Sequence, residues 1–146
     1  MNIVKIKRLN KLAKIPTRGT AESAGYDLYA ATDKDIQISP HSNVKIGTGI
    51  AMSIPNGFFG GIFARSGVAT KRNMRPSNCV GIIDSDYTGE VIVSIHNDST
   101  ETKTIQSGER IAQLVIVPYL SIIFDEVNEL DETERGAGGF GSTGEK

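Results

Sequence analysis

The sequence predicts an all-β domain, built as a sandwich or a barrel of short strands. Apolar residues recur at every second position over 44–54 and again over 91–95, which is the period of a half-buried strand. Proline and glycine divide the chain into short segments, with a turn signal at residues 55–57. Few stretches sustain the 3.6-residue period of a helix, so helices contribute little to the predicted fold.

The expected elements follow one another with turns between them. One helical segment of one or two turns is expected over Ser66–Arg72, with Ser66 near its N-terminal cap. Apolar spacing in the acidic segment 124–130 would allow a helix, but the segment is short and we favour a strand. Pro118 ends the last buried strand. The other predicted strands lie at residues 4–6, 36–38, 44–54, 91–95 and 111–117.

Length and composition place the chain among globular proteins of one domain. Its 146 residues are 38% hydrophobic and 23% charged, which suffices for a single core. No run of 18 apolar residues is present, and residues 1–14 carry charges where a signal peptide would be apolar, so no membrane partner is expected. The net charge of −1 supplies no basic field, so no nucleic-acid partner is expected either.

Cysteine and histidine are scarce. Cys79 is the single cysteine, which excludes an intramolecular disulfide and favours a reducing compartment. The expected location is therefore the cytoplasm, or the interior of the host cell if the chain is viral or from a phage. Only His41 and His96 accompany the cysteine, so no zinc site is expected. We interpret Cys79 as a small buried or half-buried residue and not as a nucleophile.

Charge is segregated at the two ends of the chain. Residues 1–21 contain six basic side chains and no acid, whereas residues 125–134 contain six acidic side chains and no base. Two solvated faces would explain this pattern. The alternative is that the two ends attract each other, within one chain or between subunits.

The last residues of the chain form a segment of different composition. Residues 136–144 contain five glycines in nine positions, so this stretch cannot hold one conformation alone. It is either a disordered tail or a lid that becomes ordered over a ligand, and the aromatic and hydroxyl residues within it favour the lid. We therefore divide the chain into a β domain at 1–134 and a flexible tail at 135–146 that covers the active site. Residues 139–146 approach a P-loop pattern, but Glu145 stands where its lysine should be.

Five short motifs stand in order along the chain. They are Ala24–Leu28 (AGYDL), Gly61–Ala69 (GIFARSGVA), Gly81–Glu90 (GIIDSDYTGE), Gly108–Leu114 (GERIAQL) and Arg135–Gly144 (RGAGGFGSTG). In order, spacing and content they closely resemble the five motifs of the trimeric deoxyuridine triphosphatases. The resemblance runs from about residue 15 to the C-terminus. One departure is Ala64, where the family usually has proline.

This resemblance implies both a fold and an activity. The implied subunit is a jelly-roll-like distorted barrel of the β-clip type, with one short helix after Ser66, assembled as a homotrimer. Each active site would lie between subunits, with the tail of one chain covering a site formed by others. The implied reaction is Mg²⁺-dependent hydrolysis of dUTP to dUMP and pyrophosphate, by attack of water on the α-phosphorus.

Residues of the first, second and fourth motifs suit a triphosphate. Arg65 can fork onto phosphate oxygens, and Ser66 and Gly67 stand at the start of the expected helix, where free amides bind anions. Gln113 can donate to a phosphate oxygen or to the attacking water, although a strand residue of this type often only points outward. The resemblance implies that Asp27 reaches Mg²⁺ through water, with the ion held mainly by the substrate phosphates.

The third motif carries the catalytic and base-selecting residues. Asp84 would be interpreted as a turn residue without the other motifs, but it can hold the attacking water, and the resemblance implies that role, with Arg65 and Gln113 beside it. A hairpin over 78–87 can match the edge of uracil with backbone donors and acceptors. The resemblance places Asn78 on the base and Tyr87 against the sugar, where no space remains for a 2′-hydroxyl.

The tail completes the implied site. Phe140 resembles the aromatic residue that stacks on the base, and Arg135, Ser142 and Thr143 would meet the terminal phosphates. The expected substrate-binding residues are Arg65, Ser66, Gly67, Asn78, Gly81, Ile83, Asp84, Tyr87, Gln113, Arg135, Phe140, Gly141, Ser142 and Thr143.

Two other functions were weighed against hydrolysis of dUTP. The related dCTP deaminases have a similar fold but lack this pairing of the third and fifth motifs. A non-catalytic nucleotide sensor that binds a regulatory protein is the second alternative, and the complete motif set argues against it.

Overall fold

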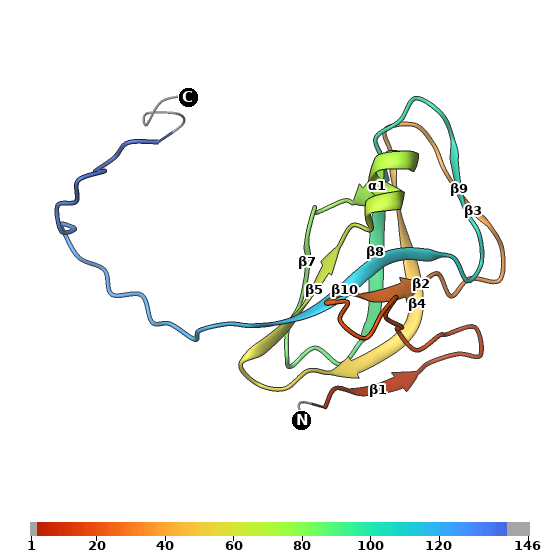
Figure 1. Cartoon of the computed structure of the whole chain (residues 1–146), viewed down its shortest axis with the longest axis horizontal. Coiled ribbons are helices and arrows are strands. Elements are labelled where there is room, and N and C mark those ends of the chain that lie inside the picture. Colours follow the sequence, from red (N-terminus) through yellow and green to blue (C-terminus); the bar gives the residue numbers. More distant parts are fainter. Residues whose placement is uncertain (1–2, 140–146) are drawn as a thin grey trace.

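The computed structural model describes residues 3–139, which contain ten β-strands and one short α-helix (Figure 1). Every strand pairing is antiparallel, so the predicted all-β class is confirmed. The elements are β1 (Lys5–Arg8), β2 (Tyr26–Tyr29), β3 (Ile36–Ile38), β4 (Asn43–Ser53), β5 (Phe58–Phe63), α1 (Ser66–Arg72), β6 (Met74–Pro76), β7 (Gly81–Ile83), β8 (Glu90–Asn97), β9 (Lys103–Ile105) and β10 (Arg110–Pro118).

Two four-stranded sheets share one hydrophobic core. The first sheet has the order β1-β4-β8-β6 and the second the order β2-β10-β5-β7, while β3 and β9 form a separate pair. Along β8 the side chains of Val91, Val93 and Ile95 are buried and alternate with more exposed ones, as the two-residue period predicts. They pack in one cluster with buried side chains of the second sheet, such as Leu28 and Leu114.

The longest strand, β4, contains an irregularity that glycine makes possible. Its register with β8 shifts between Gly47 and Ala51, and Gly49 has a φ of 65°. A Cβ atom at Gly49 would lie 2.9 Å from the Cβ of Ala13, so both the backbone conformation and the space require glycine. The Gly49 amide donates to Oε1 of Glu90 at 2.8 Å, which fixes the start of β8 against the bulge.

The expected helix after Ser66 is present as α1. Arg65 occupies its N-cap position with no side-chain cap, so Ser66 is the first helical residue and not the cap. Within α1, Val68 is the buried residue. Asn73 ends α1 in the left-handed conformation, with a φ of 52°, and its amide bonds the Val68 carbonyl.

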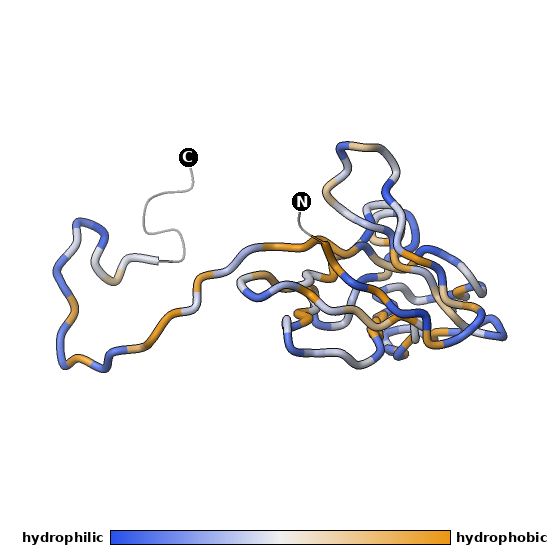
Figure 2. The backbone as a smooth tube through the Cα atoms, turned by 90° about the horizontal axis from the view of Figure 1, so that it is seen from below, coloured by the Kyte–Doolittle hydropathy of each residue, from blue (hydrophilic) through white to orange (hydrophobic). Residues whose placement is uncertain are grey.

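The chain after β10 leaves the body of the domain (Figure 1). The strand that we favoured over residues 124–130 is wrong, because residues 119–139 contain no strand or helix. We call residues 119–130 the arm. A strand needs a partner for its amides and carbonyls, and the described part of this chain offers the arm none. Apolar residues recur along it (Figure 2), and four of them are largely exposed: Leu120 at 87%, Ile123 at 96%, Phe124 at 90% and Leu130 at 88%.

The division into a domain at 1–134 and a tail at 135–146 remains a prediction. The last strand ends at Pro118, so the packed body ends before the arm begins. Within residues 3–139, no helix has the length and apolar character needed to cross a membrane.

Candidate active site

Asp27 lies at the centre of a charged cluster in the second sheet. Its side chain is 13% exposed, and both of its carboxylate oxygens accept from arginines. Arg65 Nε donates to Oδ1 at 2.6 Å, and Arg110 Nη1 donates to Oδ2 at 3.1 Å. Such charge-assisted bonds fix the direction of both guanidinium groups. Arg65 is thereby presented at the turn that leads into α1, with 26% of its side chain exposed.

Gln113 joins this cluster through the strand register. In β10, Gln113 stands opposite Asp27 of β2 on one side and opposite Phe63 of β5 on the other. Its Nε2 donates to the Ala64 carbonyl at 2.8 Å, so the side chain is turned toward the turn before Ser66 and is not free in solvent. We call Asp27, Arg65, Arg110 and Gln113 the Asp27 cluster.

Close contact with Gln113 explains why position 25, beside Tyr26 in the first motif, is glycine. A Cβ atom at Gly25 would lie 2.3 Å from Oε1 of Gln113 and 3.1 Å from its Cδ. Gln113 could therefore not keep both its position and its bond to Ala64 if residue 25 had a side chain. The first and fourth motifs are coupled at this contact.

Ser66 and Gly67 form the exposed start of α1. Both residues are exposed, and nothing lies within 4 Å of the position that a Cβ atom of Gly67 would take. The N-cap has no side-chain partner, so the first amides of the helix are available to an acceptor. An anion placed here would also meet Arg65, which precedes the helix.

Arg72 and Glu109 tie the other end of α1 to the fourth motif. Arg72 donates to Glu109 Oε1 and to the carbonyl of Thr104, while Glu109 Oε2 accepts from the Gln106 amide at 2.9 Å. Burial lowers the pKa of the Arg72 guanidinium from its usual value. These contacts hold the helix against the turn that leads into β10.

The segment 78–87 forms a second group of predicted residues. It contains β7, which pairs with β5 so that Gly81 faces Ile62 and Ile83 faces Gly60. Asn78 and Asp84 are exposed on either side of this strand. The side-chain nitrogen Nδ2 of Asn78 lies 3.6 Å from the position that a Cβ atom on Gly81 would take. The side chain of Asn78 therefore lies near the backbone of β7.

Tyr87 is held within the turn that follows β7. The hairpin expected over residues 78–87 is wrong, because β7 is the only strand in this segment and pairs with β5 of the second sheet. Its hydroxyl donates to the Glu90 carbonyl at 2.9 Å, and its amide donates to the Asp84 carbonyl at 3.1 Å. The side chain is 43% exposed, so one surface of the ring is available for contact with another molecule.

A single chain does not bring Asp84 to the Asp27 cluster. In the second sheet, β10 and β7 lie on opposite sides of β5. Gln113 pairs with Phe63 of β5. Asp84 comes directly after Ile83, which pairs with Gly60 of β5. The offset along β5 is therefore about four residues, or about 13 Å.

The predicted tail residues are only partly described. Arg135 is exposed, and its Nε donates to the Gly138 carbonyl at 2.9 Å. The predicted residues Phe140, Gly141, Ser142 and Thr143 lie outside the described part of the chain.

Arg110 is the site residue that the sequence predictions missed. It stands inside the fourth motif, but its partner is 83 positions away, and only the pairing of β2 with β10 brings the two together. The signal available in the sequence was its place in the fourth motif, three residues before Gln113.

The charges of the Asp27 cluster decide how a metal could bind. One carboxylate stands between two guanidinium groups, so the cluster carries a net charge of about +1 and would repel an isolated cation. Among residues 3–139 no group of three or more potential ligands is assembled. Asp27 fits Mg²⁺ only in the way expected above, through water and with substrate phosphates as the main ligands.

This arrangement defines an all-β protein with a charged cluster beside the exposed start of a short helix and, apart from it, an exposed segment at 78–87. Comparison with known proteins gives the family: the dUTPase family profile matches residues 11–144. The chain belongs to the dUTPase family, and the predicted resemblance is confirmed.

Similar proteins include the deoxyuridine 5′-triphosphate nucleotidohydrolase of Desulfitobacterium hafniense, 44% identical over 149 residues that cover 99% of each chain. The protein of the same name from Nautilia profundicola is 48% identical over 141 residues, with 97% of this chain and 98% of the relative covered. One similar solved structure is that of a mutant Staphylococcus bacteriophage 80alpha dUTPase with dUpNHpp. It is 32% identical and has a TM-score of 0.86, and the comparison covers 99% of each chain. The dUTPase from phage phi11 of S. aureus, solved with a structural Mg(II) ion, is 27% identical with a TM-score of 0.81, over 90% of this chain and all of that one.

Proposed function

We propose that the chain hydrolyses dUTP to dUMP and pyrophosphate, by attack of water on the α-phosphorus, with Mg²⁺ and with selectivity for uracil and deoxyribose. The observation that carries this proposal is the Asp27 cluster, in which Asp27 holds Arg65, the residue that precedes the exposed start of α1. A triphosphate needs this kind of fixed positive charge and positioning, and little covalent help from the protein. The named relatives, which span nearly the whole chain, support the same substrate.

Asp84 is the proposed holder of the attacking water. It is exposed at the end of β7, where no arginine of its own chain neutralises it in the described structure. Orientation of the water matters more than basicity in a loose phosphoryl-type transition state, so an ordinary aspartate suffices. Gln113 and Arg65 complete the proposed catalytic set at the phosphates. Bound Mg²⁺ would neutralise phosphate charge, with Asp27 reaching it through water.

Base and sugar selection are assigned to the segment 78–87. Uracil presents an acceptor, a donor and a second acceptor, which the backbone of Gly81 and Ile83 and the side chain of Asn78 can match. Cytosine would leave a donor facing a donor, and a mismatch of that kind can cost up to about 10⁴-fold. Tyr87 has an exposed ring whose hydroxyl is already bonded, so the proposed role is to fill the space of a 2′-hydroxyl.

The proposed active unit is a homotrimer whose sites are shared between subunits. Asp84 and the Asp27 cluster belong to one reaction but lie on opposite sides of β5, so residues of different chains must meet. The arm exposes large apolar side chains, which is costly for an isolated chain. A cavity of about 420 Å³ lined by apolar side chains, Ile6, Met52, Phe58 and Ile116 among them, offers comparable surface on the body of the domain.

Other predictions about the reaction and its setting also stand as proposals. The tail at 135–146 is assigned the role of lid, with Arg135, Ser142 and Thr143 at the terminal phosphates and Phe140 on the base. The cytoplasm, or the host cell interior for a viral or phage chain, is the proposed location.

Release of pyrophosphate from eight nucleotides tests the proposal, with and without Mg²⁺. The eight are ATP, GTP, CTP, UTP, dATP, dGTP, dCTP and dUTP. We expect release from dUTP alone, and only with the metal. Ammonia from dCTP would instead indicate a deaminase, and binding of dUTP without turnover would indicate a nucleotide sensor. Sedimentation of the purified protein tests the trimer.

A further inference from the structure

The turn that carries Asn78 lies between the two sheets and belongs to neither of them. The strand before it, β6, is an edge of the first sheet, and the strand after it, β7, is an edge of the second. Residues 77–80 cross between these edges with no strand register of their own. The position of Asn78 therefore depends on side chains that hold the turn.

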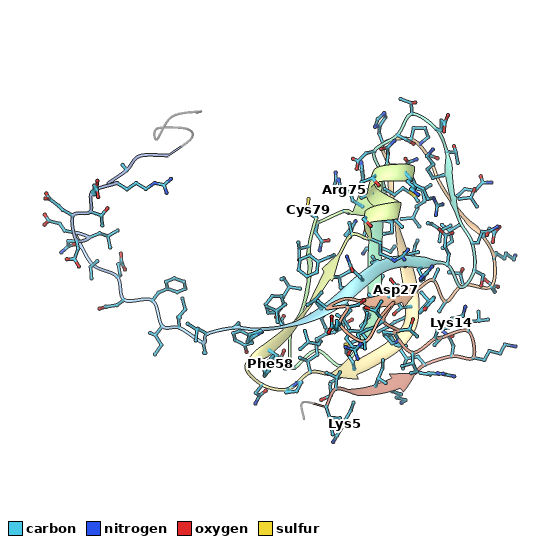
Figure 3. The ribbon with its side chains drawn as sticks, in the orientation of Figure 1. Lys5, Lys14, Asp27, Phe58, Arg75 and Cys79 are labelled. Carbon is cyan, nitrogen blue, oxygen red and sulfur yellow. The ribbon has the colours of Figure 1, made fainter. Side chains whose placement is uncertain are left out.

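Arg75 is the side chain best placed to hold it. From β6, its Nη1 lies 3.4 Å from the Pro76 carbonyl, 3.3 Å from the Ser77 carbonyl and 3.8 Å from Sγ of Cys79. One guanidinium nitrogen thus lies near three groups of the turn. Figure 3 shows where Arg75 and Cys79 lie in the fold. Each contact is long, so their effect comes from acting together and from the rigid plane of the group.

Asp98 fixes the orientation of that guanidinium. Arg75 Nε lies 2.9 Å from Oδ2 of Asp98, and Arg75 Nη2 donates to Oδ1 at 3.1 Å, which is a two-pronged ion pair. Asp98 is anchored in turn, because its amide donates to the Asn73 carbonyl at 2.8 Å. His96, which is level with Arg75 in the sheet, lies 3.4 Å from the same carboxylate.

The backbone of the turn is under strain that requires such support. Cys79 is exposed, so its expected burial is wrong: it lies in a turn between the two sheets and not in the core. It has a φ of 62°, a conformation that residues with side chains rarely adopt. Its amide bonds the Pro76 carbonyl at 2.9 Å, and the Val80 amide bonds the Asn78 carbonyl at 2.7 Å. Ser77 bonds Ser94 of β8 through both its amide and its hydroxyl, at 2.8 Å each, which holds one end of the turn but not the other.

We propose that Arg75, oriented by Asp98, is a positioning residue that fixes the 77–80 turn and thereby sets the affinity and selectivity of the enzyme for the uracil base. This inference rests on the proposed function, since it assigns Asn78 and β7 to the base. Arg75 itself need not touch the nucleotide. Its ion pair is 37% and 41% exposed, and pairs of this kind contribute little to stability, so loss of the clamp should leave the fold intact.

Steady-state kinetics of Arg75→Met test the proposal, with dUTP and dCTP as substrates. We expect the KM for dUTP to rise about tenfold, the kcat to stay within about twofold, and the preference for dUTP over dCTP to fall about tenfold. Arg75→Lys should recover part of the affinity, because lysine keeps the charge but not the fork. Asp98→Asn should raise the KM for dUTP by a smaller factor than Arg75→Met does. If Arg75→Met does not fold, the KM of Asp98→Asn tests the positioning role in its place.

Lys103→Met is the matched control, because Lys103, the first residue of β9, forms an ion pair with Glu101 that lies outside the 77–80 turn. An unchanged KM and preference in Arg75→Met, the same change in the control, or a loss confined to kcat would each overturn the positioning role. Failure of the unaltered protein to release pyrophosphate from dUTP would overturn the proposed function instead, so the two failures are distinguishable.

Discussion

The Asp27 cluster and the segment 78–87 are held by the fold in different ways. In the cluster, two adjacent strands and the turn before α1 supply the side chains, and both oxygens of a largely buried carboxylate are engaged by arginines. In the segment, the exposed side chains of Asn78, Asp84 and Tyr87 are placed mainly by hydrogen bonds of nearby backbone. Substitution in the cluster should therefore lower both stability and activity, whereas substitution in the segment should lower activity alone.

The largest expected effect is that of Asp84→Asn. We expect kcat to fall about 10³-fold, because the amide no longer accepts and orients the water as a carboxylate does. Binding of dUpNHpp, measured by calorimetry, should be retained, and the thermal midpoint should be unchanged because the side chain is exposed. Turnover at the rate of the unaltered enzyme would remove Asp84 from the mechanism.

Deletion of residues 135–146 should follow, with a loss of about 10²-fold in kcat/KM. A stacked aromatic residue is worth about 1–3 kcal/mol, and Phe140 would be lost with the phosphate contacts. In the part of the tail that the structure describes, hydrogen bonds reach no further than three residues along the chain. Circular dichroism and sedimentation should therefore show an intact oligomer, and loss of folding would contradict the assignment of this segment as a lid.

Asp27→Asn should lower kcat/KM about 30-fold, because Arg65 loses the partner that directs it. It should also lower the free energy of unfolding by about 1.5 kcal/mol, since two guanidinium groups are left facing each other. Asp33→Asn is the control, as Asp33 is exposed, and its free energy of unfolding should stay within about 0.5 kcal/mol of the original. Equal denaturation midpoints for Asp27→Asn and Asp33→Asn would contradict the expectation that substitution in the Asp27 cluster lowers stability.

Tyr87→Ala gives the smallest of these effects. We expect the ratio of kcat/KM for dUTP over UTP to fall about tenfold, because the space beside the sugar opens to a 2′-hydroxyl. Activity on dUTP itself should change less. A ratio identical to that of the unaltered enzyme would mean that another group senses the sugar.

The sequence predicted the elements whose signal is local. The alternation along residues 44–54 and 91–95 gave the strands, and residues 66–72 gave the helix, because burial of one face imposes those periods. The pairing of Asp27 with Arg65 and Arg110 could not be derived in this way, since it depends on the order β2-β10-β5. The arm shows the converse error, because apolar spacing suggested a strand where the described chain provides no partner.

The bond from Gln113 to Ala64 has a consequence for sequence variation. Its acceptor is a main-chain carbonyl, which every amino acid supplies, so the contact is indifferent to the side chain at position 64. Alanine at position 64, where the family usually has proline, leaves that acceptor in place. Relatives of this chain can therefore diverge at position 64 while the turn before the helix keeps its anchor.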